Sequence, residues 1–215
     1  MSEKANSAVV QKEKKEILKR AEDTLLTAQV GLEDLISGLP EKKVAGLRNL
    51  IVFGRAVTNV LQNLRSVDPT FEDWYQKYRQ EMESDPLMKY FYKLRSEILK
   101  EGKLGFFSHA YIANLRIPED IARLGPPPPN AKGFFIGDRL GGSGWEIQLP
   151  DGSTEKQYVH LPYDIGIVSL QFPDPPEFHL GIKIQNKSIE ELSTMFIGYI
   201  ARLVNLAKEK FNLGG

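Results

Sequence analysis

Apolar residues recur at intervals of three and four through the first half of the chain, which is the spacing of amphipathic helices. This pattern predicts four helices, over 12–37, 41–65, 70–83 and 85–102. The last of them begins at Asp85-Pro86, where Asp suits the N-cap and Pro the first helical position. Because only short links join the four helices, we expect them to pack antiparallel.

Glycine and proline mark one helix end and one point inside a helix. Gly38 and Pro40 follow the first helix in the order expected past a helix C-terminus. Gly54 lies within the apolar stripe of the second helix. Since one interior glycine costs a helix only about 1 kcal/mol, we interpret Gly54 as a point of close helix packing rather than a break.

The pattern changes beyond the fourth helix. The segment 106–123 is ambiguous, and 126–129 is a run of prolines typical of a stiff connector. Over 133–160 the apolar period falls to two, with turn residues at 141–144 and 151–152. This stretch therefore predicts a β-meander or a pair of hairpins.

A capping box predicts one more helix near the C-terminus. Ser188 and Glu191 have the spacing that lets each side chain bond the other's backbone N–H, and the helix is expected to run to about Phe211. The strongly apolar face of this helix needs a partner, and the N-terminal helices carry the only large apolar surface. We therefore expect the last helix to pack against them.

These patterns together predict a mainly α fold, an antiparallel helical bundle with a β-hairpin or meander insertion before the last helix. The expected divisions are a helical bundle over 1–125, a β-rich insertion over 126–187 and a closing helix over 188–215. The alternative is a separate α+β domain from about residue 130.

Composition narrows the chemistry. The chain has 215 residues, 41% hydrophobic and 26% charged, as expected of a globular protein. Its 28 basic and 28 acidic residues give zero net charge, which argues against coating nucleic acid by charge alone. The absence of cysteine excludes disulfides, thiolate catalysis and cysteine-bound metals. We expect a soluble cytoplasmic protein, because the charged N-terminus shows no signal peptide and no segment reaches the apolar length of a membrane span.

Familiar catalytic and cofactor motifs are absent from the sequence. The glycine-rich run 137–144 lacks the Lys-Ser/Thr of a phosphate loop and predicts a β-turn. His109, His160 and His179 lie on different predicted elements, without the spacing of metal ligands. No serine stands in a nucleophile-elbow motif. The sequence therefore predicts no metal and no cofactor.

Aromatic and basic residues alternate across the third and fourth predicted helices. The aromatic members are Trp74, Tyr75, Tyr78, Tyr90, Phe91 and Tyr92, and the basic members are Lys77, Arg79, Lys89, Lys93 and Arg95. Such a mixture could stack on single-stranded nucleic acid and neutralise it. Helical spacing favours the alternative, in which the aromatic residues are core and the cations form a solvated rim.

Two stretches of the predicted bundle resemble a known superfamily. The segment Lys93–Gly102, with Asp85–Phe91 before it, resembles the third conserved helix of the HEPN (higher eukaryotes and prokaryotes nucleotide-binding) superfamily, where a Leu-Arg-Asn…His-Gly pattern ends at a glycine. The run Phe53–Gln62 is similar to the second helix of HEPN-like bacterial proteins. The resemblance covers residues 12–102 and, if the bundle closes as predicted, the final helix.

The resemblance implies a protein that dimerises through its helices and acts in toxin–antitoxin, antiviral or RNA-processing systems. HEPN ribonucleases use an Arg-x4–6-His motif, in which the Arg binds phosphate and the His moves a proton. Arg95 takes the Arg position, but Ser96 stands for the Asn and Lys100 for the His. Lysine, with an ordinary pKa of about 10.4, is a poor base at neutral pH unless burial lowers that pKa. An alternative alignment on Leu47-Arg48-Asn49 places Phe53 at the His position.

Three functions follow as hypotheses. The first is a HEPN-like homodimeric protein that binds RNA, a nucleotide or a protein partner without efficient catalysis. Its expected RNA or nucleotide contacts are Arg55, Lys89, Lys93 and Arg95. The second is a metal-independent endoribonuclease whose site is formed by Arg95 with Lys100 or His109. The third is a plain protein-interaction module that uses the aromatic residues of the β insertion. Zero net charge favours this hypothesis, because strong RNA binders carry an excess of basic residues. For Arg95, an ion pair or a helix-end contact is the structural alternative.

Overall fold

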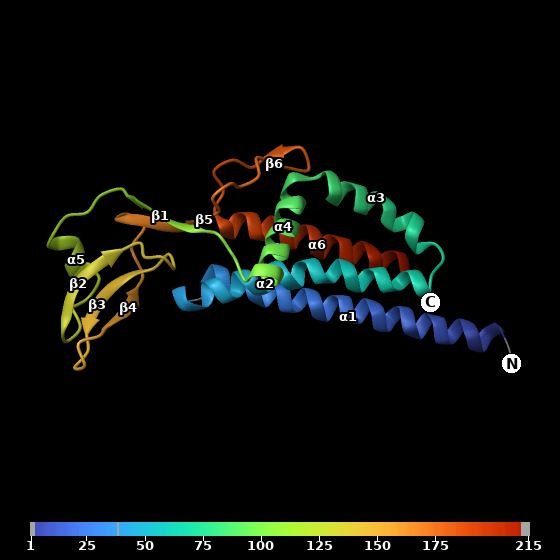
Figure 1. The fold of residues 1–215 in the computed structure, drawn as a ribbon, viewed down its shortest axis with the longest axis horizontal. Coiled ribbons are helices and arrows are strands. Elements are labelled where there is room, and N and C mark those ends of the chain that lie inside the picture. The colour runs from blue at the N-terminus through green and yellow to red at the C-terminus, as the bar shows by residue number, and fades with distance from the viewer. Residues whose placement is uncertain (1–2, 38, 212–215) are drawn as a thin grey trace.

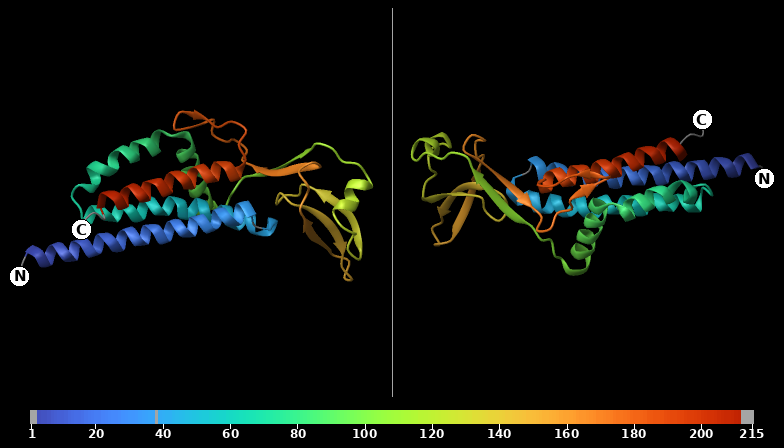
Figure 2. Two further views of the ribbon diagram at one scale, coloured as in Figure 1. Left: turned by 180° about the vertical axis from the view of Figure 1, so that it is seen from behind. Right: turned by 90° about the horizontal axis from the view of Figure 1, so that it is seen from above.

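The computed structural model describes residues 3–37 and 39–211, with a helical body at one end and a β-rich part at the other (Figure 1). The helical body contains α1 (Glu3–Ser37), α2 (Pro40–Leu61), the 3-10 helix η1 (Gln62–Ser66), α3 (Phe71–Ser84), α4 (Pro86–Glu101) and α6 (Ile189–Phe211). The start of α1 and the end of α6 lie at the end of the molecule away from the β-rich part (Figure 2).

Helix α2 lies at the centre of the body, and glycines let its neighbours approach closely. A Cβ added at Gly46 would lie 2.6 Å from the carbonyl oxygen of Gly31 on α1, and one added at Gly31 would lie 2.7 Å from that of Gly46. A Cβ added at Gly54 would lie 2.6 Å from the ring of Phe196 on α6. The interpretation of Gly54 as a point of close packing is therefore confirmed.

Helix α4 crosses the body steeply, and both of its ends are fixed locally (Figure 1). The Asp85 carboxylate accepts a hydrogen bond from the Met88 N–H at 2.9 Å, and Pro86 occupies the first turn, as the sequence predicts. Gly102 ends the helix with a left-handed φ of 66°. Between these ends, Phe91 stacks on Phe196 with ring centroids 4.2 Å apart, which joins α4 to α6.

The predicted capping box at the start of α6 is confirmed. Glu191 N–H donates to the Ser188 hydroxyl at 3.2 Å, and Ser188 N–H donates to the Glu191 carboxylate at 2.9 Å. The apolar face of α6 is buried in the same core as α1, α2 and α4, as expected from its need for a partner.

Within residues 3–37 and 39–211 the strands form three antiparallel sheets, two of them in the β-rich part and the third beside α4 on the helical body (Figure 1). β1 (Phe107–Ile112) pairs with β5 (Gly166–Gln171) in a two-stranded ribbon, and β2 (Ala131–Ile136), β3 (Ser143–Gln148) and β4 (Thr154–Val159) form a meander. β6 (Phe178–His179) pairs with β7 (Ile182–Lys183), and α5 (Glu119–Arg123) is a short helix between β1 and β2. The ribbon leads from the helical body to the meander, so the chain leaves and returns along paired strands (Figure 1).

The predicted fold class, an antiparallel helical bundle with a single β-hairpin or meander insertion, is wrong. The described residues form seven strands in three separate sheets, and β1 lies ahead of the predicted insertion over 126–187. The segment 106–123 looked ambiguous because its strand is specified by a partner that follows much later, with Phe107 opposite Gln171 and Ile112 opposite Gly166. Such long-range pairing leaves little trace in a local pattern.

Contrary to the expectation that no segment reaches the apolar length of a membrane span, residues 40–66 meet the criteria for a membrane-spanning helix by length and composition, with a mean hydropathy of 1.2. In the structure this segment is a core helix. Its apolar residues Leu47, Leu50, Ile51, Val57 and Leu61 are fully buried. The core helix of a water-soluble protein passes the same test, so the segment is weak evidence for a membrane.

The close approach of α1 and α2 predicts a matched pair of glycine variants. Gly46→Ala forces a methyl group against the α1 backbone, so we expect it to lower the free energy of unfolding by about 1–3 kcal/mol. Gly198→Ala, on an exposed face of α6 with no heavy atom within 4 Å of the added Cβ, is expected to leave stability unchanged or raise it by up to about 1 kcal/mol. Urea unfolding of both variants checks this. Equal destabilisation of the two would contradict the packing account.

An ion pair between α1 and the turn before α3 predicts a pH dependence. The Lys14 ammonium lies 2.7 Å from the Asp68 carboxylate, which also accepts two hydrogen bonds from Thr70. Burial raises the pKa of Asp68, but the hydrogen bonds from Lys14 and Thr70 outweigh it and hold the pKa below its ordinary value. Asp68 therefore stabilises the fold above pH about 4, and this stabilisation is lost as the pH falls through the lowered pKa.

Asp68→Asn should accordingly reduce the free energy of unfolding at pH 7 and have a much smaller effect near pH 2–3, where the native carboxyl is protonated. The control Asp23→Asn changes an exposed carboxylate on α1 and should have little effect at either pH. Chemical unfolding at several pH values tests the pair. A loss for Asp68→Asn that is the same at all pH values would argue against the ion pair.

Candidate functional site

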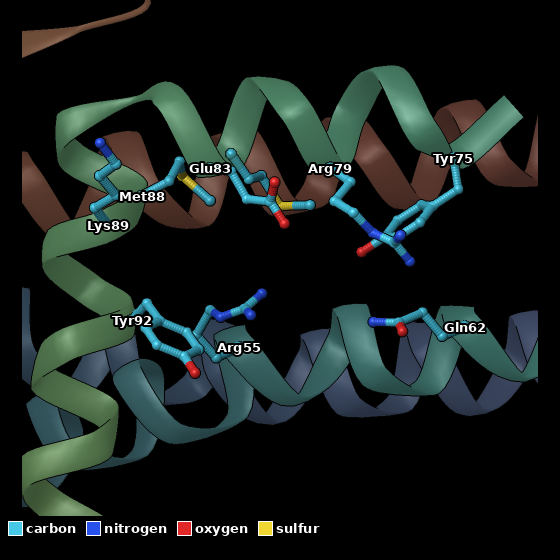
Figure 3. Close-up of a pocket in the computed structure, with 9 residues that line it drawn as sticks. Arg55, Gln62, Tyr75, Arg79, Glu83, Met88, Lys89 and Tyr92 are labelled. Carbon is cyan, nitrogen blue, oxygen red and sulfur yellow. The ribbon is translucent and has the colours of Figure 1, made fainter. Parts of the chain in front are cut away.

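A cavity of about 340 Å³ opens between α2, α3 and the first half of α4 (Figure 3). These helices follow one another along the chain, so the segment from Arg55 to Tyr92 turns around the cavity and supplies all of its walls. Three cationic side chains line it: Arg55, Arg79 and Lys89. The other lining residues that matter for its chemistry are Gln62, Tyr75, Glu83 and Tyr92.

Arg55 extends from α2 into the cavity. Its Nη1 donates a hydrogen bond to the Thr58 hydroxyl at 2.6 Å, and its guanidinium carbon lies 5.2 Å from the centre of the Tyr92 ring. Burial lowers the pKa of Arg55 below its ordinary value, and the nearby positive charge of Arg95 lowers it further. The pKa of an arginine lies so high that the group stays charged at neutral pH.

Arg79 extends from α3, on the wall opposite Arg55 (Figure 3). Its guanidinium lies 3.1 Å from the Glu72 carboxylate and 5.7 Å from the centre of the Tyr75 ring. Burial raises the pKa of Tyr75, so its hydroxyl is neutral at physiological pH and can act as a hydrogen-bond donor. Two guanidinium groups therefore face the cavity from opposite sides.

The cavity has an excess of positive charge. Lys89 lies at the α4 end, and Glu83 is the one acidic residue among those that line the walls. Within the described ranges 3–37 and 39–211, no carboxylate forms an ion pair with Arg55 or Lys89. Lys89 is exposed, whereas Arg55 is half-buried. A half-buried cation without a counter-ion is only partly hydrated, so the Arg55 guanidinium favours an anionic ligand.

The structure brings together only part of the predicted site. Arg55 and Lys89 line the cavity, and Arg95 is half-buried on α4, close enough for its charge to act on Arg55. Lys93 is exposed and pairs with Glu97 at 3.8 Å.

The two residues predicted to be catalytic, Arg95 and Lys100, are not brought together. Both lie on α4, five positions apart, which places them about 140° apart around the helix axis. Lys100 is exposed in the last turn of α4 and does not line the cavity.

Three residues that line the cavity were not predicted as site residues. Arg79 was named only as a member of the aromatic and basic cluster, and Glu83 and Gln62 were not proposed as ligand contacts. The core interpretation of that cluster is confirmed for Tyr75, Tyr78 and Phe91, which are buried, whereas Tyr92 is 54% exposed. The spacing of Tyr75 and Arg79 could have identified Arg79 as a site residue, because it places a cation one helical turn beyond a buried aromatic residue and therefore at the edge of the core.

The three histidines lie in separate surroundings. His179 is buried, with its Nδ1 3.0 Å from the Asp85 carboxylate, and holds the β6–β7 hairpin against the start of α4. His109 is exposed on β1, and His160 is exposed just after β4. Among the residues that the structure describes, no three or more His, Asp or Glu side chains form a group that could hold a metal ion.

A second cavity, of about 570 Å³, lies where the start of α2 meets the β-rich part. Its walls carry Lys43, His160, Tyr158 and Tyr163. Lys43 pairs with Glu190 at 3.6 Å, so the one lysine of this cavity already has a counter-ion. The cavity between α2, α3 and α4 has three cationic side chains, of which only Arg79 has an acidic partner among the described residues, so it is better suited to an anion.

Comparison with known protein families gives a match over the middle of the chain. The family described as bacteriophage lambda protein ea47 matches residues 40–124, which is 85 of the 215 residues and includes every residue that lines the α2–α3–α4 cavity. The chain is thus similar to that family over the cavity-forming helices. Neither the curated proteins nor the solved structures contain a significant match.

The surroundings of Arg55 predict how the fold responds to its removal. Arg55→Met keeps a long aliphatic side chain and loses one hydrogen bond and an unpaired charge, so we expect the free energy of unfolding to change by no more than about 1 kcal/mol. Chemical denaturation measures this directly. A loss above about 3 kcal/mol would instead identify Arg55 as a structural arginine.

Proposed function

We propose that this protein binds the phosphate group of a nucleotide or of single-stranded RNA in the α2–α3–α4 cavity. The observation that carries the proposal is the pair of guanidinium groups that extend into the cavity from opposite walls, Arg55 toward the Tyr92 end and Arg79 toward the Tyr75 end, with Lys89 beside Tyr92 on α4. Guanidinium groups bind phosphate oxygens through paired, charge-assisted hydrogen bonds, which makes arginine the residue most suited to this task.

Aromatic side chains beside the cations support a nucleotide over a simple inorganic anion. Tyr92 is 54% exposed at one end of the cavity, and Tyr75 forms part of the opposite end. Stacking of a base on an exposed aromatic ring contributes about 1–3 kcal/mol and tolerates any base. The cavity volume of about 340 Å³ also falls at the lower end of the range of small-molecule sites, about 300–1,000 Å³.

A protein-interaction role is the second candidate, because the β1–β5 ribbon exposes apolar side chains. Phe107, Tyr111 and Ile167 are 46%, 62% and 49% exposed, and Tyr111 lies opposite Ile167 in the sheet. The aromatic residues that the sequence suggested for this role pack on one another in the meander instead, with Phe134 against Trp145 at a centroid distance of 5.1 Å.

The nucleotide proposal predicts a charge-specific loss of binding. Titration calorimetry with uridine monophosphate, and fluorescence anisotropy with a 5′-phosphorylated oligouridine, should both show binding to the native protein. Arg55→Ala or Arg79→Ala should weaken it by at least about tenfold, which corresponds to one lost charge-assisted bond. Affinity for the oligouridine should also fall as salt is raised.

Arg139→Ala is the matched control, since it removes the same charge from an exposed position on the β-rich part. It should bind like the native protein. If neither ligand binds, or if Arg55→Ala and Arg139→Ala have the same effect, the proposal is wrong.

A further inference from the structure

The cavity is open on one side but is bounded at both ends along the direction of α2 and α3. One end lies against α4, at Lys89 and Tyr92, and the other lies where α2 runs through η1 and a short turn into α3, at Gln62 and Tyr75 (Figure 3). Proteins that track a nucleic-acid backbone use a positively charged groove in which the strand can continue past the site. A strand that lay along α2 and α3 would meet α4 at one end and the turn after η1 at the other.

The inner wall of the cavity reaches the core. Tyr75 and Met88 line the cavity although they are only 2% and 3% exposed. A group that enters therefore stops against buried side chains. Such a cavity suits the end of a molecule, or a molecule small enough to enter whole.

The charge of the lining matches a terminal phosphate. Among the lining residues, Arg55, Arg79 and Lys89 contribute three positive charges and Glu83 one negative charge, a formal charge of +2, and Glu72, which pairs with Arg79 at 3.1 Å, lies just outside this lining. A terminal phosphomonoester carries a charge of about −1.5 to −2 at pH 7 and has three strongly accepting oxygens. An internal phosphodiester carries a single negative charge and has only two such oxygens.

The positions of the two guanidinium groups point the same way. They extend from opposite walls, Arg55 toward the Tyr92 end and Arg79 toward the Tyr75 end, so they approach the space between them from two sides (Figure 3). In a continuous strand, the sugars on both sides of an internal phosphate occupy space around it. A terminal phosphate has a sugar on one side only and leaves its other oxygens free for Arg55 and Arg79.

We propose that the α2–α3–α4 cavity recognises a terminal phosphomonoester attached to a nucleoside, and not the internal phosphodiester chain. This inference rests on the proposed function and specifies its ligand. The phosphate lies between Arg55 and Arg79, and Tyr92 at the cavity end stacks on the adjoining base. The terminal phosphate belongs either to a free nucleoside monophosphate or to the 5′ end of a single strand.

The test compares oligouridines that differ only at the 5′ end and carry a fluorophore at the 3′ end. One has a 5′-phosphate, one a 5′-hydroxyl, and one a 5′-phosphate blocked as its methyl diester. Anisotropy should show the 5′-phosphate binding at least about tenfold more tightly than the other two. The preference should disappear in Arg55→Ala and persist in Arg139→Ala.

A pH titration adds a readout that a merely structural arginine would not affect. The second pKa of a phosphomonoester is about 6, so affinity for the 5′-phosphate should fall between pH 7.5 and pH 5. Affinity for the methyl diester, whose charge is constant over this range, should change much less.

Uridine monophosphate then distinguishes the two sources of the terminal phosphate. If it competes with a dissociation constant close to that of the 5′-phosphorylated strand, a free nucleotide is sufficient. If the strand binds much more tightly, the site recognises a strand end, and either result supports the inference.

Two outcomes would overturn the inference, and they differ in what they mean for the proposed function. If all three oligouridines bind equally and their binding still depends on Arg55, the cavity binds internal phosphates. The inference is then wrong, and the proposed function stands. Absence of binding, or binding that is indifferent to Arg55, refutes both.

Discussion

The arrangement of the helical body depends on how closely α2 approaches its neighbours. At Gly31 and Gly46 the backbones of α1 and α2 are in contact, and at Gly54 the ring of Phe196 occupies the place of a side chain. Neither contact tolerates a Cβ without displacement of the neighbour. Because Gly54 faces α6, the next residue, Arg55, is turned by about 100° and extends toward α3 and α4. Packing on one side of α2 thus sets the direction of the charged group on the other.

The same core contacts keep the cavity open with its charges in place. Phe91 joins α4 to α6 by stacking on Phe196, and Asp85 fixes the start of α4 by capping it and accepting hydrogen bonds from the β6–β7 hairpin. Helix α4 is therefore held across the end of the α2–α3 pair. A cation such as Arg55, half-buried and without an acidic partner among the described residues, is a cost to the fold that an anionic ligand would remove. This is the pattern expected of a binding site built on rigid helices.

Local signals in the sequence predicted the helices well. The expected helix over 41–65 corresponds to α2 and η1. The helix caps at Asp85 and Ser188 are present at the positions that the sequence motifs predicted. The first helix begins at Glu3 rather than near residue 12, because the polar residues before the apolar stripe still favour a helix. These features depend on neighbours within a few positions along the chain.

Features that depend on distant pairing were not predicted. β1 is paired with β5 across more than fifty residues, and its own pattern did not identify it as a strand. Two of the three cationic residues that line the cavity, Arg55 and Lys89, were predicted as ligand contacts from the sequence. The third, Arg79, was not, because the turn between α2 and α3 is what brings it to the wall opposite Arg55. Resemblance to a short motif directed attention to Arg95 and Lys100, although their spacing of five residues on a predicted helix already separates them by about 140° around its axis.

The most direct test of the account is a crystal structure of the protein soaked with uridine monophosphate. The account predicts phosphate density between the guanidinium groups of Arg55 and Arg79, with the base against Tyr92. Nucleotide density in the cavity beside Lys43 and His160, or an unoccupied α2–α3–α4 cavity at a saturating nucleotide concentration, would contradict it.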